Sequence, residues 1–247
     1  MHHRFRGLTA VVTGAGRGLG LGCARALALE GAEVVLVSRT QPELDAAVAA
    51  IQQAGGQARA FACDVTDPVA VIKLFDGLTR CDVLINNAGG NTPQPFLDVD
   101  VATLDRLLTL NVRSMFLVAQ AAARVMARTG GGAIVHMSSQ MGHVGGPQRS
   151  VYCMTKHAIE GLTKAMAIDL APLGIRVNAV APTYIETPMT KPFLEDPAFR
   201  ADTVQRIPLG RIGTIEEVVA ATLFLAAHEA SLITGTSLLV DGGYTAQ

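Results

Sequence analysis

The sequence has 247 residues, of which 49% are hydrophobic and 17% charged, so it can supply one large α/β core. A formal net charge of −1 and the lack of any basic run argue against a nucleic-acid or anionic-membrane partner. No stretch approaches the roughly 20 uninterrupted apolar residues of a membrane-spanning helix, and no spacing of histidines or cysteines predicts a metal site. The four scattered cysteines, with no secretory signal ahead of them, indicate free thiols in a cytoplasmic protein.

Short β-branched runs alternate with longer amphipathic segments along the whole chain. In chain order we expect a strand at 9–13, a helix at 20–31, a strand at 33–38, a helix at 42–56, a strand at 58–63, a helix at 67–79, a strand at 82–89, a helix at 102–128, a strand at 132–139, a helix at 151–171, a strand at 175–182, an irregular stretch at 183–212, a helix at 215–227 and a strand at 236–243. Strict alternation with apolar strands predicts a doubly wound parallel sheet, covered by helices on both faces, in a single domain spanning 1–247.

The carboxyl ends of the expected strands carry small, polar and glycine-rich residues. They are Thr13–Gly20, Ser38–Arg39, Asp64, Asn86–Gly90, Ser138–Ser139 and Pro182–Thr187. In an open parallel sheet, ligands bind beyond these ends, where the strand order reverses. The sequence therefore predicts a ligand site along one edge of the sheet.

The segment "TGAGRGLG" joins the first expected strand to the first helix. The spacing G-x-x-x-G-x-G fits at Gly14, Gly18 and Gly20, whereas the commoner G-x-G-x-x-G fails because Leu19 stands where a glycine is needed. Glycines allow a tight turn and close backbone approach, and the helix start offers free N–H groups to a pyrophosphate. A turn that only packs helix against strand remains the alternative.

Tyr152 and Lys156 form the one Tyr-x-x-x-Lys of the chain, and at this spacing the two side chains share a helix face. A free phenol has a pKa of about 10, and a nearby ammonium favours the phenolate and lowers that pKa, which suits general acid–base catalysis. Lys156 can also donate to a sugar hydroxyl of a cofactor, and Ser139 can donate to a substrate oxygen. This stretch therefore predicts a proton-transfer site.

Taken together, "TGAGRGLG", "NNAG", the asparagine of "LNVRS", the serine of "MSSQ" and "YCMTK" resemble the short-chain dehydrogenase/reductase family, from Leu8 to Gly243. The resemblance implies that Tyr152 is the acid/base, that Lys156 lowers its pKa and holds the nicotinamide ribose, and that the serine thirteen residues earlier, Ser139 rather than Ser138, orients the substrate.

Asn111 completes the set of catalytic residues that the resemblance implies. There it holds a water that passes protons from Lys156 to solvent. From the residues alone, an asparagine in this apolar helix could equally be buried and satisfied by a backbone carbonyl.

The second strand ends in Ser38 and Arg39, with no acidic residue to accept from a ribose 2′-hydroxyl. Because a guanidinium can bind a 2′-phosphate, we expect NADP(H) in preference to NAD. Arg17 is a candidate for a second positive charge at that phosphate, with a solvated loop residue as the alternative. The resemblance implies further cofactor contacts from Leu19, Asp64, Val65, Asn87, Gly89, Pro182, Ile185 and Thr187. Thr183 replaces the glycine that the family usually has there.

Residues 1–182 are expected to be mainly cofactor-binding, and 183–212 to form a substrate loop or lid. With Ser139, Gln140 and Tyr152, the side chains of Gln94 and His143 would line a pocket for a small oxygenated substrate such as a sugar, a sugar acid or a hydroxy-ketone. His143 as a structural loop histidine is equally compatible with the sequence.

Two other functions remain open. One is a reductase of 3-oxoacyl thioesters on an acyl carrier protein, for which Arg113, Arg124 and Arg128 are the only basic patch; the other is a catalytically silent nicotinamide-binding regulator. Family members commonly pair the helices at 102–128 and 151–171 across a two-fold axis and add an interface from the last strand. A homotetramer is therefore expected.

Overall fold

The computed structural model describes residues 3–247, which form one parallel sheet of seven strands in the order β3-β2-β1-β4-β5-β6-β7. The strands are β1 (Thr9–Thr13), β2 (Glu33–Ser38), β3 (Gln57–Ala62), β4 (Val83–Asn86), β5 (Gly132–Met137), β6 (Ile175–Pro182) and β7 (Ser237–Val240). The chain builds outward from β1 to β3, returns to β4 on the other side of β1, and continues to β7. This order confirms the predicted doubly wound sheet in a single domain, and it places the switch point between β1 and β4.

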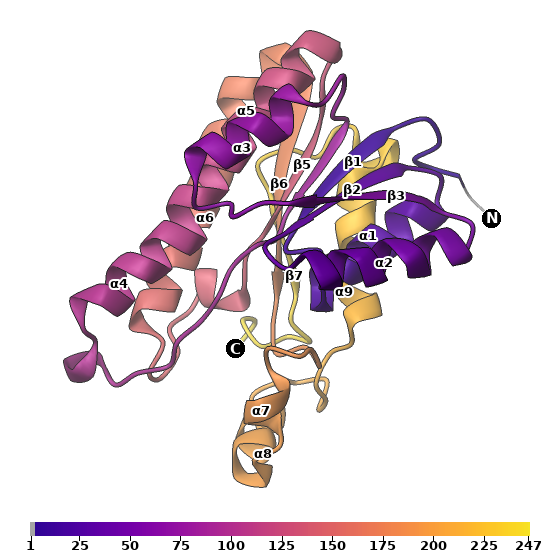
Figure 1. The fold of residues 1–247 in the computed structure, drawn as a ribbon. Coiled ribbons are helices and arrows are strands. Elements are labelled where there is room, and N and C mark those ends of the chain that lie inside the picture. The colour runs from indigo at the N-terminus through magenta and orange to yellow at the C-terminus, as the bar shows by residue number, and fades with distance from the viewer. Residues whose placement is uncertain (1–2) are drawn as a thin grey trace.

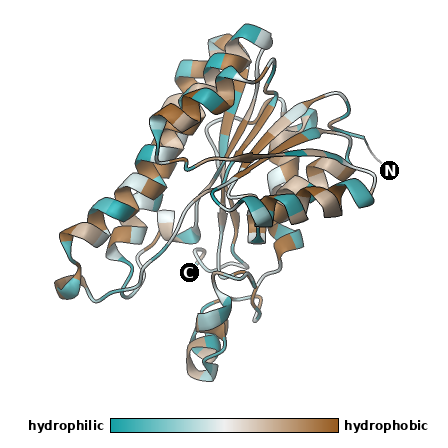
Figure 2. Cartoon of the chain, viewed as in Figure 1, coloured by the Kyte–Doolittle hydropathy of each residue, from teal (hydrophilic) through white to brown (hydrophobic). Residues whose placement is uncertain are grey.

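Helices cover both faces of the sheet (Figure 1). They are α1 (Gly18–Leu29), α2 (Gln41–Gln53), α3 (Pro68–Asp76), α4 (Val101–Leu108), α5 (Ser114–Thr129), α6 (Ser150–Leu170), α7 (Lys191–Leu194), α8 (Pro197–Gln205) and α9 (Ile215–Ala226). One buried cluster joins a sheet face to α1, α2 and α9, and a second joins the other face to α3, α5 and α6. Figure 2 shows the hydrophobic strands between helices whose outer faces are hydrophilic.

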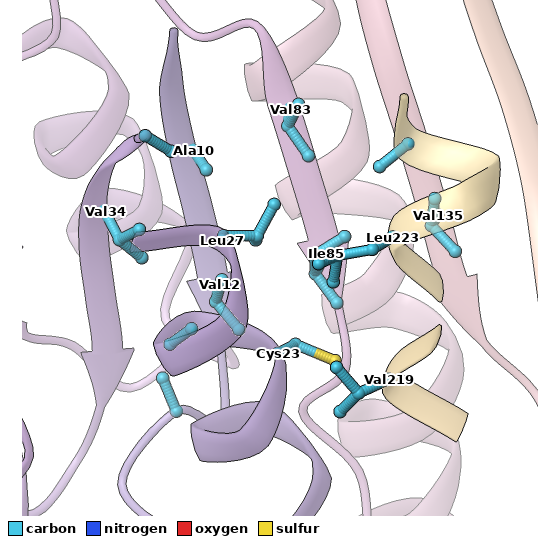
Figure 3. Close-up of a cluster of buried hydrophobic side chains, with 14 of the residues drawn as sticks. Ala10, Val12, Cys23, Leu27, Val34, Val83, Ile85, Val135, Val219 and Leu223 are labelled. Atoms are coloured by element: carbon cyan, nitrogen blue, oxygen red, sulfur yellow. The ribbon is translucent and has the colours of Figure 1, made fainter. Parts of the chain in front are cut away.

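The central strands are buried on both sides, which explains their continuous apolar sequences. Every residue of β1 and β4 is buried, and Val12 pairs with Leu36 and Ile85 across the sheet. Val12 and Ile85 pack toward α1 and α9, near Cys23 and Leu223 (Figure 3), while the intervening residues of the same strands pack against α3 and α5. The core therefore holds the ends of β1 and β4 in fixed positions.

Two segments differ from the sequence-based expectation. The helix expected at 102–128 is interrupted by a π-helical turn, Thr109–Arg113, between α4 and α5. The stretch expected to be irregular at 183–212 contains α7 and α8. A short hydrophobic cluster around Leu194, Ile207 and Ile212, separate from the two main clusters, packs this segment together with Tyr244. Its helices form because Pro192 and Pro197 stand at the helix starts, where a proline is tolerated.

Within the part of the chain that the structure describes, no helix has both the length and the apolar character needed to cross a membrane.

Candidate active site

The glycine loop between β1 and α1 requires its glycines for two different reasons. Gly14 and Gly18 have left-handed backbones, with φ of 64° and 59°. A Cβ on Gly20 would lie 2.3 Å from the carbonyl oxygen of Gly14, so no larger residue fits beneath the turn. The loop therefore lies tightly against the start of α1, whose first N–H groups are positioned for an anion.

Asn87 and Thr13 fasten this loop to the neighbouring strand. The Thr13 Oγ1 atom accepts from the backbone N–H of Asn87 at 2.9 Å and of Ala88 at 3.0 Å, and Asn87 Nδ2 donates to the Thr13 carbonyl at 2.9 Å. The predicted "NNAG" motif thus ties β4 to the loop after β1. These bonds fix the switch point itself.

A cavity of about 560 Å³ lies along the carboxyl edge of the sheet. Most of the sequence-predicted residues line it: Gly14, Arg17, Gly18, Leu19, Ser38, Arg39, Asp64, Val65, Asn87, Gly89, Ser139, Gln140, Tyr152, Lys156, Pro182, Ile185 and Thr187. Gly20 lies beneath the loop, against the Gly14 carbonyl, where a Cβ would clash. The cavity begins at the glycine loop and extends to the tyrosine on α6, so a dinucleotide and a small substrate can be held in one site.

At the end of β2, the cationic side chain of Arg39 lines the cavity. Ser38 Oγ accepts from the backbone N–H of Thr40 at 3.3 Å, which shapes the turn, and Arg39 is exposed beside it. Asp64, after β3, accepts from the backbone N–H of Thr66 at 2.9 Å; this hydrogen bond is the main reason that the pKa of Asp64 is lowered. The arginine is thus available to a phosphate at this end.

Arg17 lines the cavity with its side chain largely exposed, beside one carboxylate. Its Nη1 atom lies 4.0 Å from Glu43 Oε1, and Glu43 reaches across Gly16 so closely that a Cβ there would lie 2.7 Å from its carboxylate. Glu43 lines the cavity but was not predicted from the sequence, where it appeared only as an acidic residue in the first turn of α2.

Tyr152 and Lys156 lie one helical turn apart on α6 and both line the cavity. Lys156 Nζ donates to the Met137 carbonyl at 2.8 Å and lies 5.6 Å from the centre of the Tyr152 ring. Burial lowers the pKa of Lys156 to about 8 and raises that of Tyr152 to about 12, although a hydrogen bond with Ser139 acts to lower the tyrosine's pKa. Burial is thus the largest influence on the phenol, and the lowering of its pKa by Lys156 stays a prediction.

The two adjacent serines have different partners. Ser138 Oγ donates to the buried carboxylate of Glu160. Ser139 Oγ donates to Gln140 Oε1 at 2.7 Å and accepts from the backbone N–H of Met141 at 3.2 Å. Ser138 is thus engaged by a charged acceptor away from the tyrosine, whereas Ser139 also hydrogen-bonds Tyr152, with Gln140 beside it.

Asn111 is completely buried in the π-helical turn. Its Oδ1 accepts from the Gly90 N–H and its Nδ2 donates to the Gly90 carbonyl, both at 2.8 Å. This arrangement is the buried, backbone-satisfied asparagine that the sequence allowed. Gly89 lies between Asn111 and Lys156, since a Cβ there would be 3.3 Å from Asn111 Oδ1 and 3.9 Å from Lys156 Nζ.

Two predicted substrate residues lie outside the lining of the cavity. His143 is exposed, and its Nε2 lies 3.1 Å from Ser237 Oγ and 3.3 Å from Glu160 Oε1, because the short turn at Gln140–Gly142 directs it toward β7 and α6. The Gln94 N–H donates to the Gln148 carbonyl at 3.0 Å. Both residues therefore brace the loop before α6.

Sequence reasoning also missed Arg149 and Tyr184, which line the substrate end. Arg149 is only 7% exposed, and its guanidinium lies 5.6 Å from the ring centre of Phe193. The Tyr184 ring meets that of Phe199 edge to face at 5.7 Å. Neither residue carries a motif, and only the fold reveals that they face the cavity.

The glycine loop, the cavity at the switch point and the Ser139–Tyr152–Lys156 cluster together define an α/β oxidoreductase with a dinucleotide site. Comparison with known proteins agrees. A family model described as "Enoyl-(Acyl carrier protein) reductase" matches residues 14–245. The chain is 42% identical to L-xylulose reductase of Bos taurus over all of both chains, and 40% identical to gluconate 5-dehydrogenase of Gluconobacter oxydans, covering 97% of this chain and 95% of the relative.

Among solved structures, one provisionally assigned as an NAD(P)-dependent gluconate 5-dehydrogenase from Beutenbergia cavernae, with NADP bound at low occupancy, superposes with a TM-score of 0.96. It is 35% identical, and the match covers 100% of both chains. The protein belongs to the short-chain dehydrogenase/reductase family, as its motifs predicted.

Proposed function

We propose that the protein transfers a hydride between NADP(H) and the carbonyl or secondary alcohol of a small polyhydroxylated substrate, a sugar or sugar acid. The observation that carries the proposal is that Ser139, Tyr152 and Lys156 line the same cavity as the glycine loop. L-xylulose reductase and gluconate 5-dehydrogenase, both relatives over nearly their whole length, support this substrate class.

The preference for NADP(H) over NAD rests on the end of β2. Ser38 and Arg39 line the cavity where an acidic residue would otherwise meet the ribose, and a guanidinium suits a 2′-phosphate. The cofactor bound in the Beutenbergia cavernae structure is also NADP. The glycine loop would hold the pyrophosphate, and Pro182, Ile185 and Thr187 would lie along the nicotinamide.

Tyr152 serves as the proton donor when a carbonyl is reduced. With a pKa of about 12 its phenol is protonated at neutral pH, so it is ready to give a proton to the forming alkoxide. Ser139 orients the substrate oxygen, and Lys156, anchored on the Met137 carbonyl, holds the nicotinamide ribose. The bound nicotinamide supplies or accepts the hydride.

Asn111 keeps the role that the resemblance implies, a water site beside Lys156. Its rigid bonds to Gly90 and the closeness of Gly89 to Lys156 Nζ support a fixed position for such a water.

Residues 1–182 mainly bind the cofactor, and 183–212 form the lid. The separate hydrophobic cluster of this segment, around Leu194, Ile207 and Ile212, supports movement of α7 and α8 as one unit.

The protein is assigned as a homotetramer of the cytoplasm. Phe116 and Met154 on α5 and α6 are nearly half exposed, Ile168 is 76% exposed, and Leu239 on the edge strand β7 is 40% exposed. Apolar side chains of this size on those elements suit subunit interfaces. The cysteines are free, as in a reducing compartment.

The 3-oxoacyl thioester alternative is supported by the description of the matching family model, and its basic patch lies outside the cavity lining. Among the residues that line the cavity in the described chain, none of Arg113, Arg124 and Arg128 is present. All three are exposed on or before α5.

Assays of sugars, polyols and sugar acids with NADPH or NADP⁺ test the proposal. Turnover should fall at least a hundredfold in Tyr152→Phe, while the affinity for NADPH changes little, because general acid–base catalysis typically contributes about 10²–10⁴-fold. Tyr244→Phe, away from the cavity lining, is the matched control and should retain full activity. Activity of Tyr152→Phe within tenfold of the parent would refute the assignment.

A further inference from the structure

Arg149 is a buried cation without an acidic partner. Among the ion pairs of the described residues none involves Arg149, although its side chain is more than nine-tenths buried. The only hydrogen bond that its side chain makes within residues 3–247 runs from Nη1 to the Gln148 carbonyl and is long, at 3.5 Å. A guanidinium has five N–H donors, so most of them are left unused. Burying a guanidinium without hydrogen-bond acceptors or a negative charge is unfavourable unless a bound ligand supplies them.

The backbone before Arg149 is held in an uncommon conformation. Gln148, with a φ of 56°, is the one non-glycine residue with a left-handed backbone in the described chain. The Gln94 N–H secures it by donating to its carbonyl at 3.0 Å, and α6 starts immediately afterwards. Backbone strain of this kind persists where the surroundings enforce it, often at ligand sites. Here it directs the Arg149 side chain into the cavity.

The substrate end of the cavity has no negative charge. The two acidic residues that line the cavity, Glu43 and Asp64, follow β2 and β3, on the far side of the switch point from β5 and α6. The Arg149 side chain lines the same cavity as the Tyr152 phenol, from a position three residues earlier in the chain. Glu160, the nearest buried acid on α6, is already bonded to Ser138 and contacts His143.

Other polar atoms at this end also lack partners. Asn91 Oδ1 and Thr183 Oγ1 are buried without a hydrogen-bond partner among the described residues, and both side chains line the cavity. The Arg149 guanidinium carbon lies 5.6 Å from the centre of the Phe193 ring, a neighbour that accepts no conventional hydrogen bond and leaves the N–H groups for a ligand. A ligand with several hydroxyls and one planar anionic group would satisfy these atoms together.

We infer that Arg149 binds the carboxylate of the substrate, so that sugar acids are preferred over neutral sugars and polyols. The inference rests on the proposed function and assigns its substrate class. A planar carboxylate matches the two parallel N–H bonds of a guanidinium fork. Arg149 immediately precedes α6, Tyr152 lies in its first turn, and both line the cavity, so the carboxylate is held near the hydroxyl-bearing carbon that reacts. Arg149 is a specificity-determining residue and takes no part in proton transfer.

D-Gluconate and D-sorbitol form a matched pair of probes, because they differ in a carboxylate against a hydroxymethyl group at one end. With NADP⁺, the parent should oxidise gluconate with a kcat/KM about tenfold or more above that for sorbitol. Arg149→Met should lose about 10- to 100-fold with gluconate, mostly through KM, and change less than about threefold with sorbitol. Arg149→Lys should fall between, because it keeps the charge without the fork. Arg128→Met, at an exposed arginine on α5, should match the parent.

The outcomes separate the two proposals. If the parent turns over no sugar, polyol or sugar acid with either NADP⁺ or NADPH, the proposed function fails. If it oxidises them without preferring the acid, or if Arg149→Met loses both substrates equally, the carboxylate site is refuted while the function stands. Sorbitol 6-phosphate preferred over gluconate would also refute it, because a phosphate would then be the anion.

A binding measurement provides a readout that does not depend on turnover. Gluconate should raise the Tm of the NADP⁺-bound parent and leave that of Arg149→Met unchanged, and an equal rise in both would overturn the inference. Arg149→Met should fold well, because an apolar side chain replaces a buried unpaired charge. Arg149→Lys gives a second variant for the same comparison.

Discussion

The preference for NADP(H) can be inverted at two adjacent residues if the assignment of the β2 end is correct. Ser38→Asp with Arg39→Leu removes the guanidinium and adds a carboxylate where the 2′-phosphate would lie. A charge-assisted hydrogen bond contributes about 1.5–3 kcal/mol, but Arg39 is exposed, which reduces its contribution to about 1 kcal/mol. The new carboxylate adds about 1 kcal/mol of repulsion at 4 Å in water. The sum of about 2 kcal/mol predicts a loss of roughly 30-fold for NADP.

Values of kcat/KM for NADP⁺ and NAD⁺, measured with one saturating substrate in parent and variant, provide the assay. NAD should be spared or improved, because the added carboxylate can accept from the ribose 2′-hydroxyl. Glu43→Gln is the complementary variant: its carboxylate lies 4.0 Å from Arg17, and its removal should improve NADP several-fold with little effect on NAD. A parent that already prefers NAD, or a double variant that loses both cofactors equally, would refute the reasoning.

Three further predictions concern packing and pH. Gly20→Ala places a Cβ 2.3 Å from the Gly14 carbonyl and should lower both Tm and NADP affinity. Gly161→Ala, in open space on α6, should instead raise the free energy of unfolding by about 0.5–1 kcal/mol. If the two variants changed Tm and NADP affinity equally, this prediction would be contradicted. The pKa of Lys156 is about 8 in the fold and 10.5 in its absence, so the unfolded chain binds more protons between these values and stability should rise with pH there. In urea titrations Lys156→Met should lack that rise. The pKa of Cys81 is raised from 9.0 to about 12, so its contribution to stability is complete below pH 9 and lost as pH rises toward 12; Cys81→Ala should weaken the alkaline loss by up to about 1.4 kcal/mol per pH unit in the same titrations.

The sheet and its cofactor edge could be predicted because their signals are local. Buried strands such as β1 and β4 appear as continuous apolar runs, and each strand end carries a distinctive residue or glycine. Alternation of strand and helix then fixes the fold class. The positions of Tyr152 and Lys156 followed from helical spacing alone.

The interruption of the helix at 102–128 could not be predicted in this way. The periodicity of its apolar residues continues through Thr109–Arg113, where the structure has a π-helical turn. The cause is a long-range contact: Asn111 bonds both backbone groups of Gly90, twenty-one residues earlier. Such a contact leaves no trace in local sequence. π-Helical turns frequently mark functional sites.

Residues whose importance depends on burial were missed for a similar reason. Arg149 and Glu43 appear in the sequence as ordinary charged residues near helix starts, and only the tertiary fold reveals that one is buried and that both line the cavity. His143 shows the converse. Its type and its place in the loop suggested a substrate contact, but the turn that follows Ser139 carries it to Ser237 and Glu160.

The left-handed backbone at Gln148 implies a conflict between heat resistance and selectivity in any laboratory evolution of this enzyme. Gln148→Gly would relieve the left-handed backbone but raise the entropy of the unfolded chain, whereas an apolar side chain in place of Arg149 would remove an unpaired charge and should raise Tm. Each would also release or delete the group that we assign to substrate discrimination. Screening for thermal stability alone would therefore enrich variants that have lost substrate selectivity. Libraries at these two positions should be selected for substrate selectivity at the same time.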